Sequence, residues 1–83
     1  MLTPQSQYIK SKKLLALRLK IMRESKGFSQ QQLAAYLGLD RSTYAYYESA
    51  KTLPNIFTIL TLCDFYHLDI RYFVSKKNKE FIK

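Results

Sequence analysis

One glycine, Gly38, separates two short segments that both have the residue spacing of helices. Ser29 is suited to begin the first helix as its N-cap, and Asp40 is suited to begin the second, from Arg41 to about Ser49. The apolar positions of the first segment are Leu33, Ala34 and Leu37. Glycine adopts a positive φ without steric cost, so a turn of three to four residues at Gly38 can join the two helices closely. The sequence therefore predicts a helix-turn-helix motif between residues 29 and 49.

Three further segments have helical patterns, and no stretch alternates polar and apolar residues convincingly enough for a strand. They are expected from Ser11 to about Ser25, from Ile56 to Tyr66, and after Asp69 through Phe73. Gly27 would close the first, while Asn55 and Asp69 would cap the other two. A chain of 83 residues has room for one core. We expect an all-α domain of five short helices over residues 8–75, followed by a basic tail over residues 76–83.

Several kinds of protein and site are excluded by what the chain lacks. The single cysteine, Cys63, allows no internal disulfide and no cysteine-rich zinc site, so we expect it in the core. His67 has no partner ligands, and no metal or cofactor is expected. No paired carboxylates, activated nucleophile or phosphate-binding loop indicate an enzyme. No apolar run approaches the roughly 18 residues of a membrane span, and no signal peptide is recognisable, which predicts a cytoplasmic protein.

The net charge of +8 is concentrated at the two ends of the chain. Residues 1–26 have seven Lys or Arg against Glu24, and residues 75–83 have four Lys against Glu80. Residues 27–74 contain three basic and four acidic residues, a net charge of −1. This distribution fits a polyanionic partner, and it equally fits a solvated surface with basic ends.

The second helix of the motif has two different sides when its residues are projected at 100° per residue. Tyr44 and Tyr47 share one side, which we expect to pack on the core, with Thr43 near the edge. The opposite side is polar and available to a partner, and it contains Arg41, Ser42, Ala45 and Tyr46.

A set of different short motifs is spread over most of the chain, from about Leu15 to Val74. They are the Arg23 to Gly27 end of the first helix, the runs SQQQLA and RST, Gly38, Glu48, Pro54 and the ending HLDIRYF. With this set, the chain resembles the lambda-repressor/Cro (XRE-type) helix-turn-helix family, which implies a compact five-helix lambda-repressor-like DNA-binding domain. Two positions depart from the pattern, because Ala50 and His67 stand where the family usually has glycine. The departure at Ala50 leaves the path of the following loop open.

The resemblance implies a sequence-specific transcriptional regulator of double-stranded DNA, a dimeric repressor on a palindromic operator. The residues that would face base edges in the major groove are Arg41, Ser42, Ala45 and Tyr46. Those that would contact phosphates are Gln30, Thr43, Tyr44, Lys51 and Asn55. Arg23 and Glu48 would form a salt bridge between the first and third helices. From the residues alone, Arg41 can contact guanine or neutralise Asp40. Tyr46 can contact the sugar-phosphate backbone, or it can lie on the surface without a partner.

Surplus apolar residues indicate a covered surface. They are Leu14, Leu17 and Ile21 on the first helix, and Phe57 and Phe65 on the fourth. Either the tail covers them through Phe81 and Ile82, or a second subunit does. The resemblance favours a homodimer through Phe65, Tyr72 or Phe73. An alternative function is an antitoxin-type interaction protein that binds a toxin and regulates its own operon.

Overall fold

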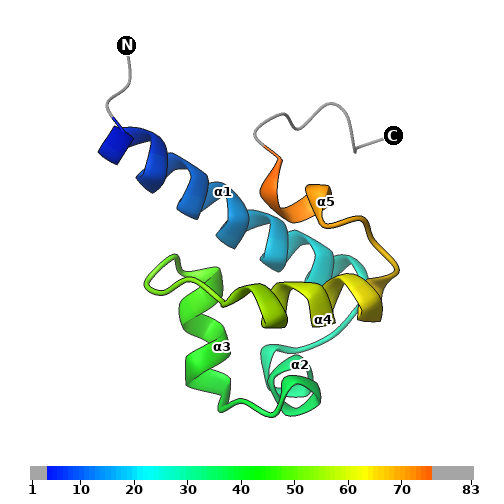
Figure 1. Ribbon diagram of the computed structural model, residues 1–83. Helices are drawn as coiled ribbons and strands as arrows, with labels where there is room; N and C mark the ends of the chain where they lie inside the picture. Colours follow the sequence, from blue (N-terminus) through cyan, green and yellow to red (C-terminus); the bar gives the residue numbers. More distant parts are fainter. Residues whose placement is uncertain (1–3, 76–83) are drawn as a thin grey trace.

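The computed structural model describes residues 4–75 of the chain. Its helices are α1 (Pro4–Ser25), α2 (Gln30–Leu37), α3 (Arg41–Glu48), α4 (Ile56–Tyr66) and α5 (Arg71–Val74). Helices α3 and α5 both pack against α1, and α2 packs against α3 (Figure 1). The described part contains no strand, and it contains no helix long and apolar enough to cross a membrane. The all-α, five-helix architecture expected from the sequence is confirmed.

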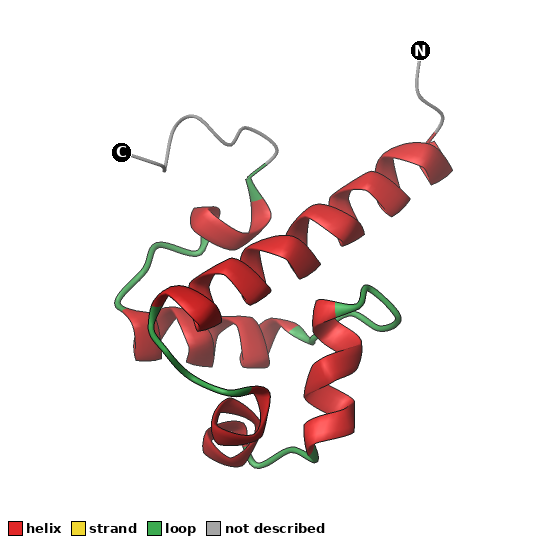
Figure 2. Ribbon diagram, turned by 180° about the vertical axis from the view of Figure 1, so that it is seen from behind, coloured by secondary structure: helices red, strands yellow, loops and turns green. Residues whose placement is uncertain are grey.

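Helix α1 begins at Pro4 and has 22 residues, so the prediction that it begins at Ser11 is wrong. Proline suits the first position of a helix, because its fixed φ is helical and the amide hydrogen it lacks would have no partner there. Pro4 was therefore a start signal in the sequence. The added turns project beyond the packed helices (Figures 1 and 2) and extend past the predicted domain boundary at residue 8.

A residue with a positive φ follows the end of each of the helices α1 to α4 by one or two residues. These residues are Gly27 at 79°, Gly38 at 72°, Ala50 at 64° and His67 at 58°. After each one, the next amide donates to the carbonyl five residues earlier, at 2.9 to 3.2 Å. The two positions that depart from the glycines of the family thus keep the left-handed conformation that favours glycine. This fixes the path of the loop after α3.

The predicted N-caps are partly confirmed. Ser29 caps α2 through a capping box with Gln32, and Asn55 accepts the amide of Thr58 at 2.9 Å. Asp40 occupies the N-cap position of α3 but makes no side-chain cap, contrary to the prediction. The last helix, α5, has Ile70 as its N-cap rather than Asp69, and it ends at Val74 rather than Phe73. Asp69 still accepts the amide of Arg71 at 2.8 Å.

The core joins all five helices. Its buried members are Leu19, Leu33, Ala34, Tyr44, Ile59, Leu62, Cys63, Tyr66 and Phe73. Ala34 is fully buried, which allows α2 to approach α3 closely. Burial raises the pKa of the Cys63 thiol, as expected for a cysteine that acts as a small apolar side chain.

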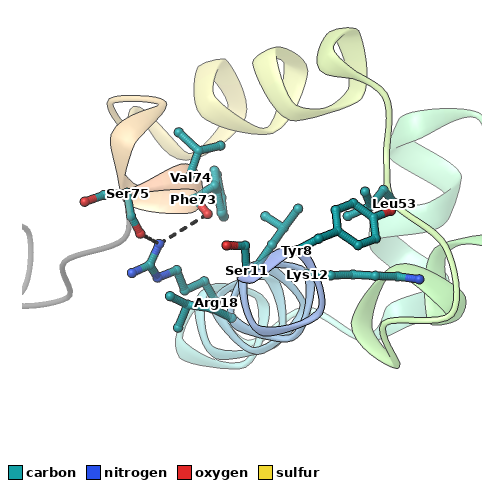
Figure 3. A pocket seen from close by; sticks show the side chains of 10 residues that line it. Tyr8, Ser11, Lys12, Arg18, Leu53, Phe73, Val74 and Ser75 are labelled. Carbon is teal, nitrogen blue, oxygen red and sulfur yellow. Dashed lines mark hydrogen bonds between the residues drawn. The ribbon is translucent and has the colours of Figure 1, made fainter. Parts of the chain in front are cut away.

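Arg18 fastens α5 to α1, a contact that the sequence analysis did not anticipate. Its guanidinium is buried and donates to the carbonyls of Phe73 and Ser75 (Figure 3). Burial lowers the pKa of Arg18 from its ordinary value. The basic side chain thus caps the carbonyl end of α5, where positive charge is favourable.

Candidate functional site

Helix α3 presents its polar side to solvent, as the helical projection predicts. Arg41, Ser42 and Tyr46 are exposed, and Ala45 is partly exposed. Because α3 has only eight residues and follows the turn at Gly38, this side is a short, accessible strip beside the start of α2 (Figure 1). The structure therefore brings together the four side chains predicted to face a partner.

The opposite side of α3 is fixed to α1 by a buried ion pair. The Arg23 guanidinium donates to Glu48 from Nε at 2.7 Å and from a terminal nitrogen at 3.0 Å. The side chains of Arg23 and Glu48 are 10% and 3% exposed, so the pair is shielded from water. Arg23 also donates to the Phe28 carbonyl at 2.8 Å, which ties the loop before α2 to the same group. The predicted salt bridge between Arg23 and Glu48 is present.

The two partners stabilise each other's charged form. Hydrogen bonding to Glu48 is the main reason that the pKa of Arg23 is raised above its ordinary value. Burial by itself raises the pKa of Glu48, but hydrogen bonds, the largest from Arg23 and another from Gln30, outweigh burial and lower it overall. Glu48 is therefore a buried carboxylate that stays ionised near neutral pH.

Gln30, the first residue of α2, connects this buried pair to the exposed strip. Its side-chain amide donates to Glu48 Oε1 at 3.1 Å, and its carbonyl oxygen accepts from Arg41 at 3.3 Å. An amide suits this place because it has a donor for the carboxylate and an acceptor for the guanidinium. Arg41 donates to Gln30, and this contact positions its side chain without Asp40, the N-cap residue of α3. The sequence analysis did not anticipate this connecting role of Gln30.

Other residues predicted to contact phosphates are Lys51 and Asn55, in the loop after α3, and Thr43, in the first turn of α3. Lys51 is exposed and its Nζ lies 5.1 Å from the centre of the Tyr46 ring, a cation–π distance. Asn55 is exposed while its side-chain oxygen caps α4, and Thr43 is partly buried. Lys12 of α1, which the sequence analysis did not single out, reaches the Lys51 carbonyl at 3.3 Å.

Tyr44 does not fit the role predicted for its hydroxyl. The side chain is fully buried, so it has no surface with which to contact a phosphate, and that prediction is wrong. Burial is the main reason that the pKa of Tyr44 is raised. The projection had placed Tyr44 on the core side of α3, and the core role is the one confirmed.

The predicted dimer residues are also more buried than expected. Phe73 is 1% exposed, so its proposed place on a subunit interface is wrong. Tyr72 is partly buried, and Phe65 packs between the rings of Phe28 and Tyr36, with centroid distances of 5.3 and 4.3 Å. Leu17, Ile21 and Phe57 remain exposed, at 52%, 49% and 75%. The tail with Phe81 and Ile82 lies outside the described residues.

The exposed strip offers hydrogen-bond donors and an aromatic ring, which are groups that can bind a partner. Arg41 can donate two parallel hydrogen bonds, Ser42 can donate or accept, and Tyr46 adds a ring and a hydroxyl. Within residues 4–75, no three His, Cys, Asp or Glu side chains gather where they could hold a metal ion. The arrangement is suited to recognising a polar, anionic surface.

Comparisons with known proteins agree with this arrangement. Residues 19–73 match the HTH_3 family, described as helix-turn-helix. The chain is also 34% identical over 64 residues to the SPbeta prophage-derived uncharacterized HTH-type transcriptional regulator YonR of Bacillus subtilis (strain 168). This match covers 77% of the chain but 59% of the relative, so the chain spans less than two thirds of that protein's length. No solved structure matches the chain significantly.

Proposed function

The chain belongs to the lambda-repressor/Cro (XRE-type) helix-turn-helix family, and we propose that it is a transcriptional regulator that binds double-stranded DNA. The observation that carries the proposal is the exposed side of α3, which presents Arg41, Ser42, Ala45 and Tyr46 together. A helix of this width fits the major groove, where the donors and acceptors of each base pair differ. The similarity to a protein named as a transcriptional regulator supports the same function.

Arg41 is the residue that we propose to read a base. A guanidinium can donate to O6 and N7 of guanine together, and this pairing discriminates against other bases by about 1 to 3 kcal/mol. The hydrogen bond of Arg41 to Gln30, at 3.3 Å, orients the side chain without burying it. Ser42, Ala45 and Tyr46 would face the adjacent bases or the sugars beside them.

The phosphate contacts would lie on both sides of this strip. Gln30 at the start of α2 can offer its backbone amide and the second hydrogen of its side-chain amide to one strand, where the helix N-terminus also favours negative charge. Lys51 and Asn55 would contact the backbone beyond the carboxyl end of α3, and the partly buried Thr43 would contact it from the edge of the first turn of α3. Such contacts would fix the register of α3 in the groove.

We further propose that the protein is a repressor that acts as a homodimer on a palindromic operator. The residues from Gln30 to Glu48 include one basic residue, Arg41, against Asp40 and Glu48, so one subunit would attract the duplex weakly. Two subunits on half-sites about one helical turn apart would double the contacts. Exposed Leu17, Ile21 and Phe57 leave apolar surface for a second copy to cover. The prophage origin in the relative's name supports a regulator of a mobile element.

The test of DNA recognition is selection of bound duplexes from a random pool, followed by titration at several salt concentrations. We expect one sequence to be enriched. With four to six phosphates neutralised per dimer, the logarithm of affinity should fall against the logarithm of salt with a slope of about −4 to −5. Equal binding of every duplex after selection would refute the proposed function as a sequence-specific regulator.

Dimerisation needs its own measurement. The full chain is sedimented alone and with the selected duplex. In the sample with the duplex, the complex should have the mass of the duplex and two subunits. If the chain stays monomeric at high micromolar concentration in both conditions, the homodimer is refuted while DNA binding by one subunit stands.

A further inference from the structure

The helix-turn-helix from Gln30 to Glu48 has one basic residue, and a group of lysines lies in the amino-terminal turns of α1. Arg23 already pairs with Glu48, so the charged groups that remain at the exposed strip are Arg41 and the neighbouring Asp40. The first three turns of α1, over residues 4–14, contain Lys10, Lys12 and Lys13 and no acidic residue. The basic amino-terminal part of the chain is thus an ordered helix.

These turns pass directly beside the loop that joins α3 to α4. The ammonium of Lys12 donates to the carbonyl of Lys51 at 3.3 Å, although the two residues are 39 positions apart. Tyr8 and Lys12 line a cleft of about 170 Å³ together with Leu53 of the loop, and both point toward the loop (Figure 3). The amino-terminal turns are therefore held at this end of α3.

The positive groups continue from this junction to the exposed strip. Lys51 lies over the Tyr46 ring, and Tyr46 belongs to the side of α3 that we propose to face bases. Lys12, Lys51 and Tyr46 consequently follow one another across α1, the loop and α3. Lys12 is partly buried, and its carbonyl contact leaves two of its three ammonium donors for a phosphate.

We propose that Lys12 and Lys51 form a phosphate-binding cluster in which the amino-terminal turns of α1 extend the DNA contact beyond the helix-turn-helix. The inference depends on the proposed DNA-binding function and names a contact that the motif alone does not include. A duplex with its bases against α3 places a backbone strand beside Lys51, and Lys12 adds a second charge to that strand. Each phosphate neutralised releases counterions, so the cluster strengthens binding in a salt-dependent way.

The test compares two lysine substitutions on the same helix. Lys12→Gln removes the charge at the cluster. Lys10→Gln removes the same charge two residues earlier, which is about 200° around the helix and so on its other side. Both variants are measured on the full chain with the duplex selected by the parent, at several salt concentrations. Thermal melting of each variant shows that it is folded.

We expect Lys12→Gln to weaken binding about fivefold or more at 0.1 M salt and to reduce the salt slope by about 0.9 per subunit. Lys10→Gln should leave the affinity within about twofold, because its distance from the strand allows salt to screen it. Lys12→Arg should restore both quantities, since the charge returns. If Lys12 only held the loop in place, affinity would fall with an unchanged slope.

Two failures are distinguishable. If the parent enriches no duplex, the proposed function is refuted and the cluster with it. If the parent enriches a duplex, but Lys12→Gln leaves the salt slope unchanged or behaves like Lys10→Gln, DNA binding stands and the phosphate role of Lys12 is refuted.

Discussion

The two sides of α3 use the same type of group, an arginine guanidinium, in opposite ways. On the buried side, Arg23 makes two hydrogen bonds to Glu48 and one to the Phe28 carbonyl. On the exposed side, Arg41 makes one hydrogen bond, to Gln30. Gln30 contacts both groups, so the two sides belong to one chain of hydrogen bonds.

This difference separates stability from recognition between the two sides of α3. The donors of Arg23 are largely occupied and its side chain is shielded from water. Loss of either partner of the pair would leave the other as an unpaired buried charge. Most donors of Arg41 face solvent and are available to a ligand. We therefore expect substitutions on the buried side to change the free energy of unfolding, and substitutions on the exposed side to change binding.

The largest effect on stability is expected for Glu48→Ala. It leaves the guanidinium of Arg23 buried without its carboxylate, which costs about 3 to 5 kcal/mol. This is a large share of a typical domain stability of about 5 to 15 kcal/mol. Urea unfolding measures the change, with the exposed Ser42→Ala as a control that should stay within about 0.5 kcal/mol. A Glu48→Ala protein that unfolds like the parent would show that the buried pair does not hold the fold.

A smaller effect on the same side is expected from acid. The pKa of Glu48 is lower in the folded protein than in the unfolded chain, so its contribution to stability is complete above the unfolded pKa and is lost as pH falls through the folded pKa. The free energy of unfolding should therefore decline below about pH 4.5, the ordinary range of a glutamate. Urea unfolding between pH 3 and 7 should show a shallower decline for Glu48→Gln, with Asp69 titrating in both proteins. Equal acid profiles would contradict this role of Glu48.

A change at the end of α3 should raise stability and leave both sides of the helix intact. Ala50 has a φ of 64°, which is costly for a residue with a side chain, so Ala50→Gly is expected to stabilise the fold by about 0.5 to 1 kcal/mol. Gly38→Ala is the matched control of opposite sign, because a methyl group there meets no atom within 4 Å and the φ of 72° alone opposes it. Thermal unfolding measures both. Ala50→Gly without any gain would contradict the account of this helix end.

The helix types were predictable from short-range signals, whereas the buried pair of Arg23 and Glu48, 25 residues apart, was predicted through the family resemblance. The capping residues Ser29 and Asn55 and the turn at Gly38 each act within a few residues, and the structure confirms them. Asp40 shows the limit of such signals, because a good cap residue stands at the right position without making the bond. The start of α1 at Pro4 was not predicted, although proline is a favourable first residue of a helix.

Contacts between distant parts of the chain could not be predicted in the same way. Arg18 reaches the carbonyls of α5, and Lys12 reaches the loop after α3, only because tertiary packing brings these segments together. The burial of Phe73 likewise depends on how α5 folds back onto α1. The chain of contacts through Gln30 needs two side-chain orientations that no local pattern specifies.

The central claim is that the exposed side of α3 reads DNA while contributing little to the fold, and Arg41→Ala tests it most directly. The measurement is selection from a random duplex pool with the parent, with Arg41→Ala and with Lys51→Ala. We expect Arg41→Ala to lose the preference at one base position, a change of about 1 to 3 kcal/mol, with its unfolding within about 0.5 kcal/mol of the parent. Lys51→Ala should weaken all duplexes alike. An unchanged base preference in Arg41→Ala would contradict the account.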